Sequence, residues 1–296
     1  RIIGRRFKLV HVIYGREIIE VSTFRAKPRQ KIQMSNGVIK DNEYGSIEED
    51  AERRDFTING LYYDVEDKNI IDFYGGLRDI QDNQLRLIGK PKLRYKEDPI
   101  RMLRAIRFAA KLKMEIHSET LSEIKNSMSL LESVPYSRLF DEIMKFFLTG
   151  HAQESMVLFK KHNLSNIYFP SLENNNKIFN NFLLQGLKNT DLRIKNDQSI
   201  NPGFLLAVFL WKDVYELNKK YKKNFPHPSL ALNKAINDVL QKQARIFPIQ
   251  KRFAITMSEI WRLQPRFNST SSKKIYRLLS HPRFRASYDF LLLRCQ

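Results

Sequence analysis

The sequence is poor in cysteine and in clustered histidine, and this excludes several classes of site. Cys295 is the only cysteine, so neither an intrachain disulfide nor a cysteine metal cluster can form. The 6 histidines are scattered and do not have the spacing of zinc ligands. Long apolar runs are also missing: residues 204–211 fall far short of the roughly 18 residues that a membrane span needs. We therefore expect a reducing, cytoplasmic setting with no membrane partner.

Acidic residues are scarce relative to basic ones. The chain has 51 Lys and Arg against 32 Asp and Glu, a net charge of +19, and the excess is spread along the whole chain. A distributed basic surface is typical of a protein whose partner is a polyanion such as RNA. The competing interpretation is a solvated basic surface that binds nothing, and charge alone does not separate the two.

The first part of the chain has the pattern of a small mixed α/β domain. Alternating apolar residues predict strands, and Gly15-Arg16 predicts the turn between the first two of them. The polar stretch from Ala26 to Tyr44 indicates a loop, and Ser46 with Glu49 forms a capping-box signature for a helix beginning near Ile47. The expected strands cover residues 7–14, 17–24, 61–65 and 85–88.

From Asp98 onward the pattern is helical almost without interruption. Asp98 suits an N-cap and Pro99 the first helical position. Further N-caps are expected at Ser118, Ser137 and Ser229, and breaks at Gly150, Asn163 and Pro170. The fold class is therefore α+β: an α/β part at 1–89, a neck at 90–150 and a helical body at 151–296. Most aromatic residues of the helical part are expected in its core, with base stacking as the alternative: Phe108, Tyr136, Phe140, Trp211, Tyr215, Trp261 and Tyr288.

The densest polar motif is Arg53-Arg54-Asp55-Phe56-Thr57-Ile58-Asn59. The forked guanidinium groups of Arg53 and Arg54 suit phosphate and ribose oxygens, because each can donate two parallel hydrogen bonds. The carboxylate of Asp55 could bind a sugar hydroxyl or help to hold Mg²⁺. For an arbitrary sequence of this kind, an Arg–Asp pair closing a helix end is the simpler explanation.

The second motif runs from Glu97 to Arg107. Asp98 and Arg101 are three residues apart, so we expect them on one helix face. A carboxylate beside a guanidinium matches the Watson–Crick edge of adenine or cytosine and mismatches guanine and uracil. Arg104 and Arg107 continue the basic stripe toward a triphosphate or an RNA backbone. In the alternative interpretation Asp98 only caps the helix and the arginines are solvated.

Together, in this order, the two motifs resemble those of the class II nucleotidyltransferases, which comprise bacterial poly(A) polymerases and CCA-adding enzymes. The resemblance covers nearly the whole chain and leans toward the poly(A) polymerases. Their head domain is similar to residues 4–12, 17–25 and 45–50, and their helical body to residues 189–194, 201–204 and 281–289.

The resemblance implies that this chain extends RNA 3′ ends with ATP, with Mg²⁺ as cofactor. It implies Asp55 as the catalytic carboxylate and Glu20 as a metal ligand, although an exposed strand residue is an equal alternative for Glu20. The nucleotide-binding residues that it implies are Arg53, Arg54, Asn59, Glu97, Asp98, Arg101, Arg104 and Arg107. RNA and ATP are the expected partners of a monomer that contacts the RNA-decay machinery.

One element of the family pattern is missing from the sequence. The family has a G-G-x-V-R-D segment and a D-x-D pair that supply the main metal ligands, and both are expected before Arg1. Phosphoryl transfer depends on such ligands. Two alternatives therefore stay open beside poly(A) synthesis: a CCA-adding enzyme, which shares both motifs, and a non-catalytic RNA-binding remnant.

Overall fold

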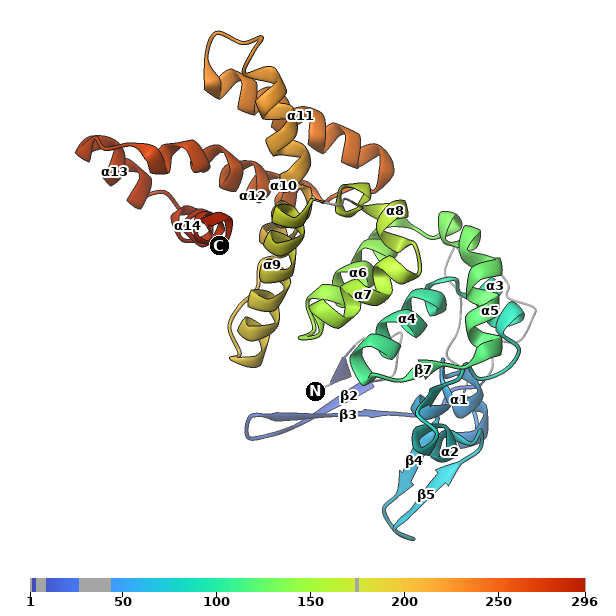
Figure 1. The fold of residues 1–296 in the computed structure, drawn as a ribbon. Coiled ribbons are helices and arrows are strands. Elements are labelled where there is room, and N and C mark those ends of the chain that lie inside the picture. The colour runs from blue at the N-terminus through green and yellow to red at the C-terminus, as the bar shows by residue number, and fades with distance from the viewer. Residues whose placement is uncertain (1, 4–8, 27–43, 174–175, 296) are drawn as a thin grey trace, which may run out of the picture. The chain divides into compact units, whose positions relative to one another are not determined.

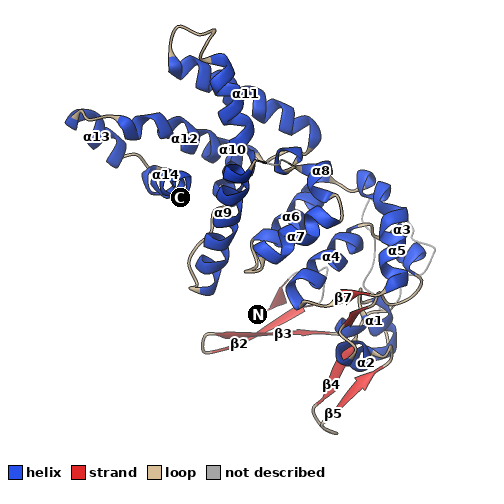
Figure 2. Ribbon diagram, in the orientation of Figure 1, coloured by secondary structure: helices blue, strands red, loops and turns tan. Residues whose placement is uncertain are grey.

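The computed structural model describes residues 2–3, 9–26, 44–173 and 176–295 (Figure 1). The chain forms two compact units: residues 1–105 with 113–130, and residues 106–112 with 131–296. Helix α4 (Ile100–Leu112) continues from the first unit into the second. Figure 2 shows that the strands belong to the early part of the chain and that the later part is helical.

Among its described residues, the first unit has three small sheets. β1, β2 and β3 form an antiparallel sheet, β4 and β5 a hairpin, and β6 and β7 a parallel pair. The tight turn between β2 and β3 places Gly15 at φ +61°, which a residue without Cβ adopts at little cost. The elements of this unit besides the start of α4 are β1 (Ile2–Ile3), β2 (Leu9–Tyr14), β3 (Glu17–Ser22), α1 (Ile47–Arg53), η1 (Thr57–Asn59), β4 (Leu61–Asp64), β5 (Asn69–Asp72), α2 (Gly76–Gln81), β6 (Gln84–Leu85), α3 (Pro91–Glu97), β7 (Glu115–Ile116) and α5 (Ser118–Ser127).

The second unit is helical around an aromatic core. Phe147 makes edge contacts with Phe159 and Phe209 at centroid distances of 5.2 and 5.1 Å, and all three rings are buried. After η2 (Met128–Ser133), which bridges the two units in sequence, its elements are α6 (Tyr136–Phe147), α7 (Ala152–Lys161), α8 (Leu164–Tyr168), η3 (Pro170–Leu172), α9 (Lys177–Lys195), α10 (Pro202–Tyr221), α11 (Pro228–Ile246), α12 (Lys251–Leu263), η4 (Gln264–Asn268), α13 (Ser272–Leu279) and α14 (Phe284–Cys295).

The locally encoded predictions are confirmed. The capping box is present: the Ser46 hydroxyl accepts from the Glu49 N–H at 3.1 Å, and the Glu49 carboxylate accepts from the Ser46 N–H at 2.8 Å. Breaks occur at Gly150 and Asn163, both with positive φ, and at Pro170. Residues 4–8 and most of the predicted loop from Ala26 to Tyr44 lie outside the described residues.

Several boundaries differ from prediction. Ser118, Ser137 and Ser229 are not N-caps: those helices begin one or two residues earlier, after His117, Pro135 and His227. Strand β3 ends at Ser22 rather than Phe24, and β6 covers only the start of the predicted 85–88 strand. The helical part also contains a short strand, β7, which pairs with β6. The three-part division at 89 and 150 stays a prediction, because the contacts group the chain into two units.

The aromatic residues divide between core and surface. Phe140, Trp211 and Trp261 are buried, as expected of core residues. Tyr136, Tyr215 and Tyr288 are exposed instead.

Candidate nucleotide-binding site

Asp55 is held by the backbone that follows helix α1. The helix ends at Arg53, and the backbone of Arg54 is extended. Phe56, two residues later, is fully buried. The Asp55 carbonyl accepts from the Ile88 N–H at 3.0 Å, and Phe56 forms a bridge with Leu87. The backbone of Asp55 is therefore fixed between two anchored neighbours.

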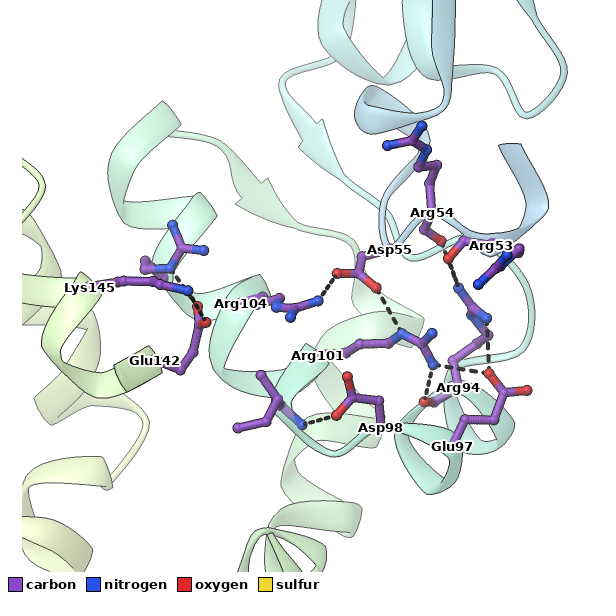
Figure 3. A network of polar contacts seen from close by, with 12 residues as sticks. Arg53, Arg54, Asp55, Arg94, Glu97, Asp98, Arg101, Arg104, Glu142 and Lys145 are labelled. Atoms are coloured by element: carbon purple, nitrogen blue, oxygen red, sulfur yellow. Dashed lines mark hydrogen bonds and ion pairs between the residues drawn. The ribbon is translucent and has the colours of Figure 1, made fainter. Parts of the chain in front are cut away.

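The carboxylate of Asp55 accepts hydrogen bonds from two arginines of α4. Oδ1 lies 2.8 Å from Nε of Arg101, and Oδ2 lies 2.6 Å from Nη1 of Arg104 (Figure 3). The arginines are three residues apart and so share one face of the helix. The side chains of Asp55 and Arg101 are 16% and 12% exposed, so this is a largely desolvated pair.

Burial of Asp55 favours the neutral acid, but the two guanidinium groups oppose it. The desolvation that raises the pKa of Asp55 is outweighed by the hydrogen bond from Arg101 and by the charge and hydrogen bond of Arg104. The pKa of Asp55 therefore lies below its ordinary value, and the group is ionised at neutral pH.

Glu97 connects two arginines of this cluster. Its Oε2 accepts from Nη1 of Arg94 at 2.9 Å and from Nη1 of Arg101 at 3.0 Å. Nη1 of Arg101 also donates to the main-chain oxygen of Arg94 at 2.8 Å. Nη2 of Arg101 makes no hydrogen bond within the part of the chain that the structure describes. Arg101 is thus fixed by three acceptors while one nitrogen remains available.

Arg94 is a central residue that the sequence analysis missed. Its Nη2 donates to the main-chain oxygens of Arg53 and Arg54, at 3.1 and 2.7 Å. Burial, and then the charge of Arg101, lower the pKa of Arg94, while Glu97 acts against that shift. The three-residue spacing from Arg94 to Glu97 was the signal available in sequence. Arg94 ties the backbone of the first motif to the side chains of the second.

The side chains of Arg53 and Arg54 make their contacts elsewhere in the first unit. Arg54 donates to the buried carboxylate of Asp50 at 2.7 and 3.2 Å, and Figure 3 shows its side chain directed away from Asp55. Arg53 donates to the Ala26 main-chain oxygen at 3.0 Å. The tyrosine hydroxyl of Tyr62 also donates to Asp50, at 2.8 Å. Both arginines therefore hold the local fold in this structure.

The structure places three further residues that the sequence singled out. Asp98 immediately precedes α4 in the manner of an N-cap: its Oδ1 accepts from the Ile100 N–H at 3.3 Å, and its main-chain oxygen accepts from the Arg101 N–H at 3.1 Å. Asn59 is exposed at the end of η1. Arg107 is buried in the second unit, where its Nε donates to Glu142 at 2.8 Å. The basic stripe of α4 thus reaches Asp55 through Arg101 and Arg104, whereas Arg107 neutralises a buried glutamate.

The described residues do not fit a Mg²⁺ site on their own. Glu20 lies opposite His11 in the β2–β3 ladder, and its Oε1 is 3.2 Å from His11 Nε2. Both carboxylate oxygens of Asp55 already form ion pairs, with Arg101 and Arg104. Within the described ranges no three His, Cys, Asp or Glu side chains gather as a metal site. Glu20 and Asp55 as metal ligands therefore stay predictions.

The charges of the cluster around Asp55 favour an anionic ligand. Three arginines, Arg94, Arg101 and Arg104, face two carboxylates, Asp55 and Glu97, which leaves an excess of positive charge. Nη2 of Arg101 is a donor that a phosphate or base acceptor could use.

Comparison with known proteins identifies the family. Three family models match in chain order: the poly(A) polymerase head domain at residues 1–86, the probable RNA- and SrmB-binding site of polymerase A at 113–175, and the arginine-rich C-terminus of polymerase A at 224–296. Poly(A) polymerase I of Escherichia coli O6:H1 (strain CFT073) is 43% identical over the whole chain, which spans 67% of that relative. The chain belongs to the bacterial poly(A) polymerase I family.

Other relatives agree with membership in this poly(A) polymerase family and with a nucleotidyltransferase fold. Poly(A) polymerase I of Haemophilus influenzae is 37% identical over the whole chain and 68% of its own length. A CCA-adding enzyme of Lactobacillus helveticus is 32% identical, but over 55% of this chain and 40% of its own. The resemblance to poly(A) polymerases is thus confirmed, with CCA-adding enzymes as the related group.

Solved structures confirm the fold. A tRNA nucleotidyltransferase crystallised with a primer tRNA and an incoming ATP analogue superposes with a TM-score of 0.60 at 24% identity, over 98% of this chain and 77% of that one. The apo form of a CCA-adding enzyme gives a TM-score of 0.63 at 19% identity, over 98% and 63%. The α+β fold class with a helical body is therefore confirmed.

Proposed function

We propose that the protein extends RNA 3′ ends with AMP units taken from ATP, without a template. The observation that carries this proposal is the 43% identity to a poly(A) polymerase I over the entire chain. In the reaction the RNA 3′ oxygen forms a bond to the α-phosphorus of ATP and loses its proton to water. The bond from the α-phosphorus to the oxygen bridging to the β-phosphorus breaks, and pyrophosphate leaves with that oxygen.

The Asp55 cluster would bind and orient the incoming nucleotide. Nη2 of Arg101 is the available donor in a guanidinium that Asp55 and Glu97 hold rigid, and it would donate to a ring nitrogen of adenine. Asp98 would accept from the exocyclic amine, in a pairing that guanine and uracil do not offer. Arg104, which is the more exposed partner of Asp55, would meet the phosphates. Preorganised donors of this kind lose little entropy on binding.

The positioning of these side chains depends on Arg94. Its bonds to the carbonyls of Arg53 and Arg54 fix the segment that presents Asp55. Arg53, Arg54 and Asn59 as direct nucleotide contacts remain part of the proposal, and they would need to exchange their present partners or positions to act so. Arg107 would act indirectly, through its pair with Glu142.

Magnesium, RNA and cellular location complete the proposal. Mg²⁺ would supply charge neutralisation at the phosphates, although the described residues alone do not form its site. RNA is the expected polyanion for a chain of net charge +19.

No helix among the described residues is long and apolar enough to span a membrane. A cytoplasmic monomer with RNA-decay contacts stays a prediction.

The test separates an enzyme from an RNA-binding remnant. The full-length protein is incubated with a labelled RNA, Mg²⁺ and each of the four nucleoside triphosphates in turn. We expect extension with ATP and release of one pyrophosphate per residue added. Salt-sensitive RNA binding with no extension by any nucleotide would support the remnant and overturn the proposal.

A further inference from the structure

A cluster of three aromatic rings near the C-terminal end of the second unit differs from the aromatic core. Phe284 and Tyr288 lie one turn apart on α14, with centroids 5.8 Å apart and ring planes at 18°. Phe267 of η4 lies 6.1 Å from each of them. Tyr288 is 39% exposed, and the other two rings are half-buried. Core rings such as Phe147 and Phe209 are, by contrast, almost fully buried.

The segment of the chain that carries these rings is strongly basic. Residues 260–296 contain eight Arg and Lys and a single acidic residue, Asp289. Four of the cations are exposed and make no ion pair among the residues that the structure describes: Arg266 on η4 and Lys273, Lys274 and Arg277 on α13. Arg285 pairs with Asp289 at 3.0 Å, yet its side chain remains 83% exposed.

Partly exposed aromatic rings and exposed cations in one segment match the chemistry of a single strand of RNA. Bases stack on aromatic rings while their phosphates contact Arg and Lys, and this combination tolerates any base sequence because every base has a π-face. An apolar protein partner would fit less well, because the cores of protein interfaces are depleted in charge. The phenol of Tyr288 makes no hydrogen bond within the described residues, so its ring is not tied to a structural polar contact.

We propose that Phe267, Phe284 and Tyr288, with Arg266 and the basic side chains of α13, form a stacking platform for single-stranded RNA. The proposal rests on the proposed function, because it names where in the second unit the RNA substrate is held. It is distinct from the Asp55 cluster, which belongs to the first unit. The platform should hold RNA without base preference, whereas nucleotide choice remains with the Asp55 cluster.

The test measures RNA binding by fluorescence anisotropy with a labelled oligo(A), in the absence of ATP. Tyr288→Ala should raise the Kd about 10-fold, which is the loss expected for one stacked base. Tyr288→Phe keeps the ring and should stay within about 2-fold of wild type. Tyr63→Ala is the matched control, because Tyr63 is an exposed tyrosine of the β4–β5 hairpin, 62% exposed. It should leave both RNA binding and extension unchanged.

Charge variants provide a second readout. Arg266→Gln and Arg277→Gln should each reduce the slope of log Kd against log salt by about one, whereas Tyr288→Ala should leave that slope unchanged. An oligo(U) of equal length should show the same Tyr288→Ala effect as oligo(A).

Defined outcomes overturn the platform. Equal affinity of Tyr288→Ala and wild type would do so, as would an equal loss in Tyr288→Phe. If the basic surface binds an acidic polypeptide such as polyglutamate as tightly as RNA, and Tyr288→Ala affects both alike, the assignment to RNA is wrong. Because binding is measured without ATP, the platform can stand when no AMP is added, and the two failures remain distinguishable.

Discussion

Nε of Arg101 donates a 2.8 Å hydrogen bond to Asp55, a residue 46 positions earlier in the chain. This bond joins the two motifs that the sequence shows separately, because Asp55 belongs to the first and Arg101 to the second. Glu97 and the Arg94 carbonyl hold the other side of the same guanidinium. The position of Arg101 is therefore set by both motifs together.

Replacing Arg101 tests the role of that guanidinium in nucleotide use. Arg101→Ala should lower kcat/KM for ATP by about 10²-fold, equivalent to about 2.7 kcal/mol. The RNA Kd should change by less than about 2-fold. Steady-state kinetics and anisotropy measure the two quantities. Arg78→Ala is the control, because Arg78 is 86% exposed on α2. Parallel losses of ATP use and RNA affinity in Arg101→Ala would contradict base reading.

Arg94 should behave as a positioning residue. Arg94→Lys removes the guanidinium group that donates to the main-chain oxygens of Arg53 and Arg54. The free energy of unfolding, measured by urea denaturation, should fall by about 2 kcal/mol. It should also lower kcat/KM for ATP. Since Arg94 and Glu97 act on the same guanidinium, Arg94→Lys and Glu97→Gln should be non-additive in kcat/KM. A purely structural role would give an additive double variant.

The ionisation of Asp55 predicts a pH dependence of stability. Its pKa is depressed below the ordinary 3.8, because Arg101 and Arg104 outweigh its burial. The stabilisation is therefore complete above the unfolded-state pKa and is lost as the pH falls through the folded-state value. The difference in unfolding free energy between wild type and Asp55→Asn should stay constant from about pH 7 to 5. It should shrink only below about pH 4, in urea titrations at each pH. If this difference in unfolding free energy instead grew as the pH fell, the pKa of Asp55 would be raised in the folded state and not lowered.

Arg107 was predicted to bind nucleotide. In the structure its side chain is buried and forms an ion pair with Glu142. Glu142 is only 3% exposed and also accepts from Lys145 at 3.2 Å. Glu142→Leu should destabilise the protein by about 3 kcal/mol, because it leaves the Arg107 guanidinium buried without its carboxylate. Arg107→Met with Glu142→Leu should recover much of that loss. Thermal unfolding measures the stability of the single and the double variant. If Arg107→Met changed the KM for ATP without loss of stability, the predicted nucleotide-binding role would be supported instead.

Features encoded by neighbouring residues were predictable from sequence. The Ser46–Glu49 capping box and the Gly15 turn depend on residues within three positions of each other. The motif residues Asp55 and Arg101 could be singled out, and the resemblance identified the family. Their mutual bond could not be derived, because it depends on where the buried Phe56 and helix α4 lie in the fold.

The placement of three other residues has specific physical causes. Asp98 was expected at an N-cap, and its Oδ1 and main-chain oxygen accept from the N–H groups of Ile100 and Arg101 at the start of α4. Arg107 has the same spacing as Arg101 and Arg104, but a partner 35 residues away draws it into a buried pair. Arg94 has a sequence signal only in its three-residue spacing to Glu97, because its other two acceptors are main-chain oxygens, which any residue offers.

The central claim is that the protein makes poly(A) rather than CCA ends. The most direct measurement supplies the full-length protein with a tRNA lacking its CCA end, Mg²⁺ and equimolar ATP and CTP, followed by sequencing of the 3′ ends. The account predicts tails of adenosine alone, with no cytidine incorporated. Ends that read cytidine, cytidine, adenosine would contradict it.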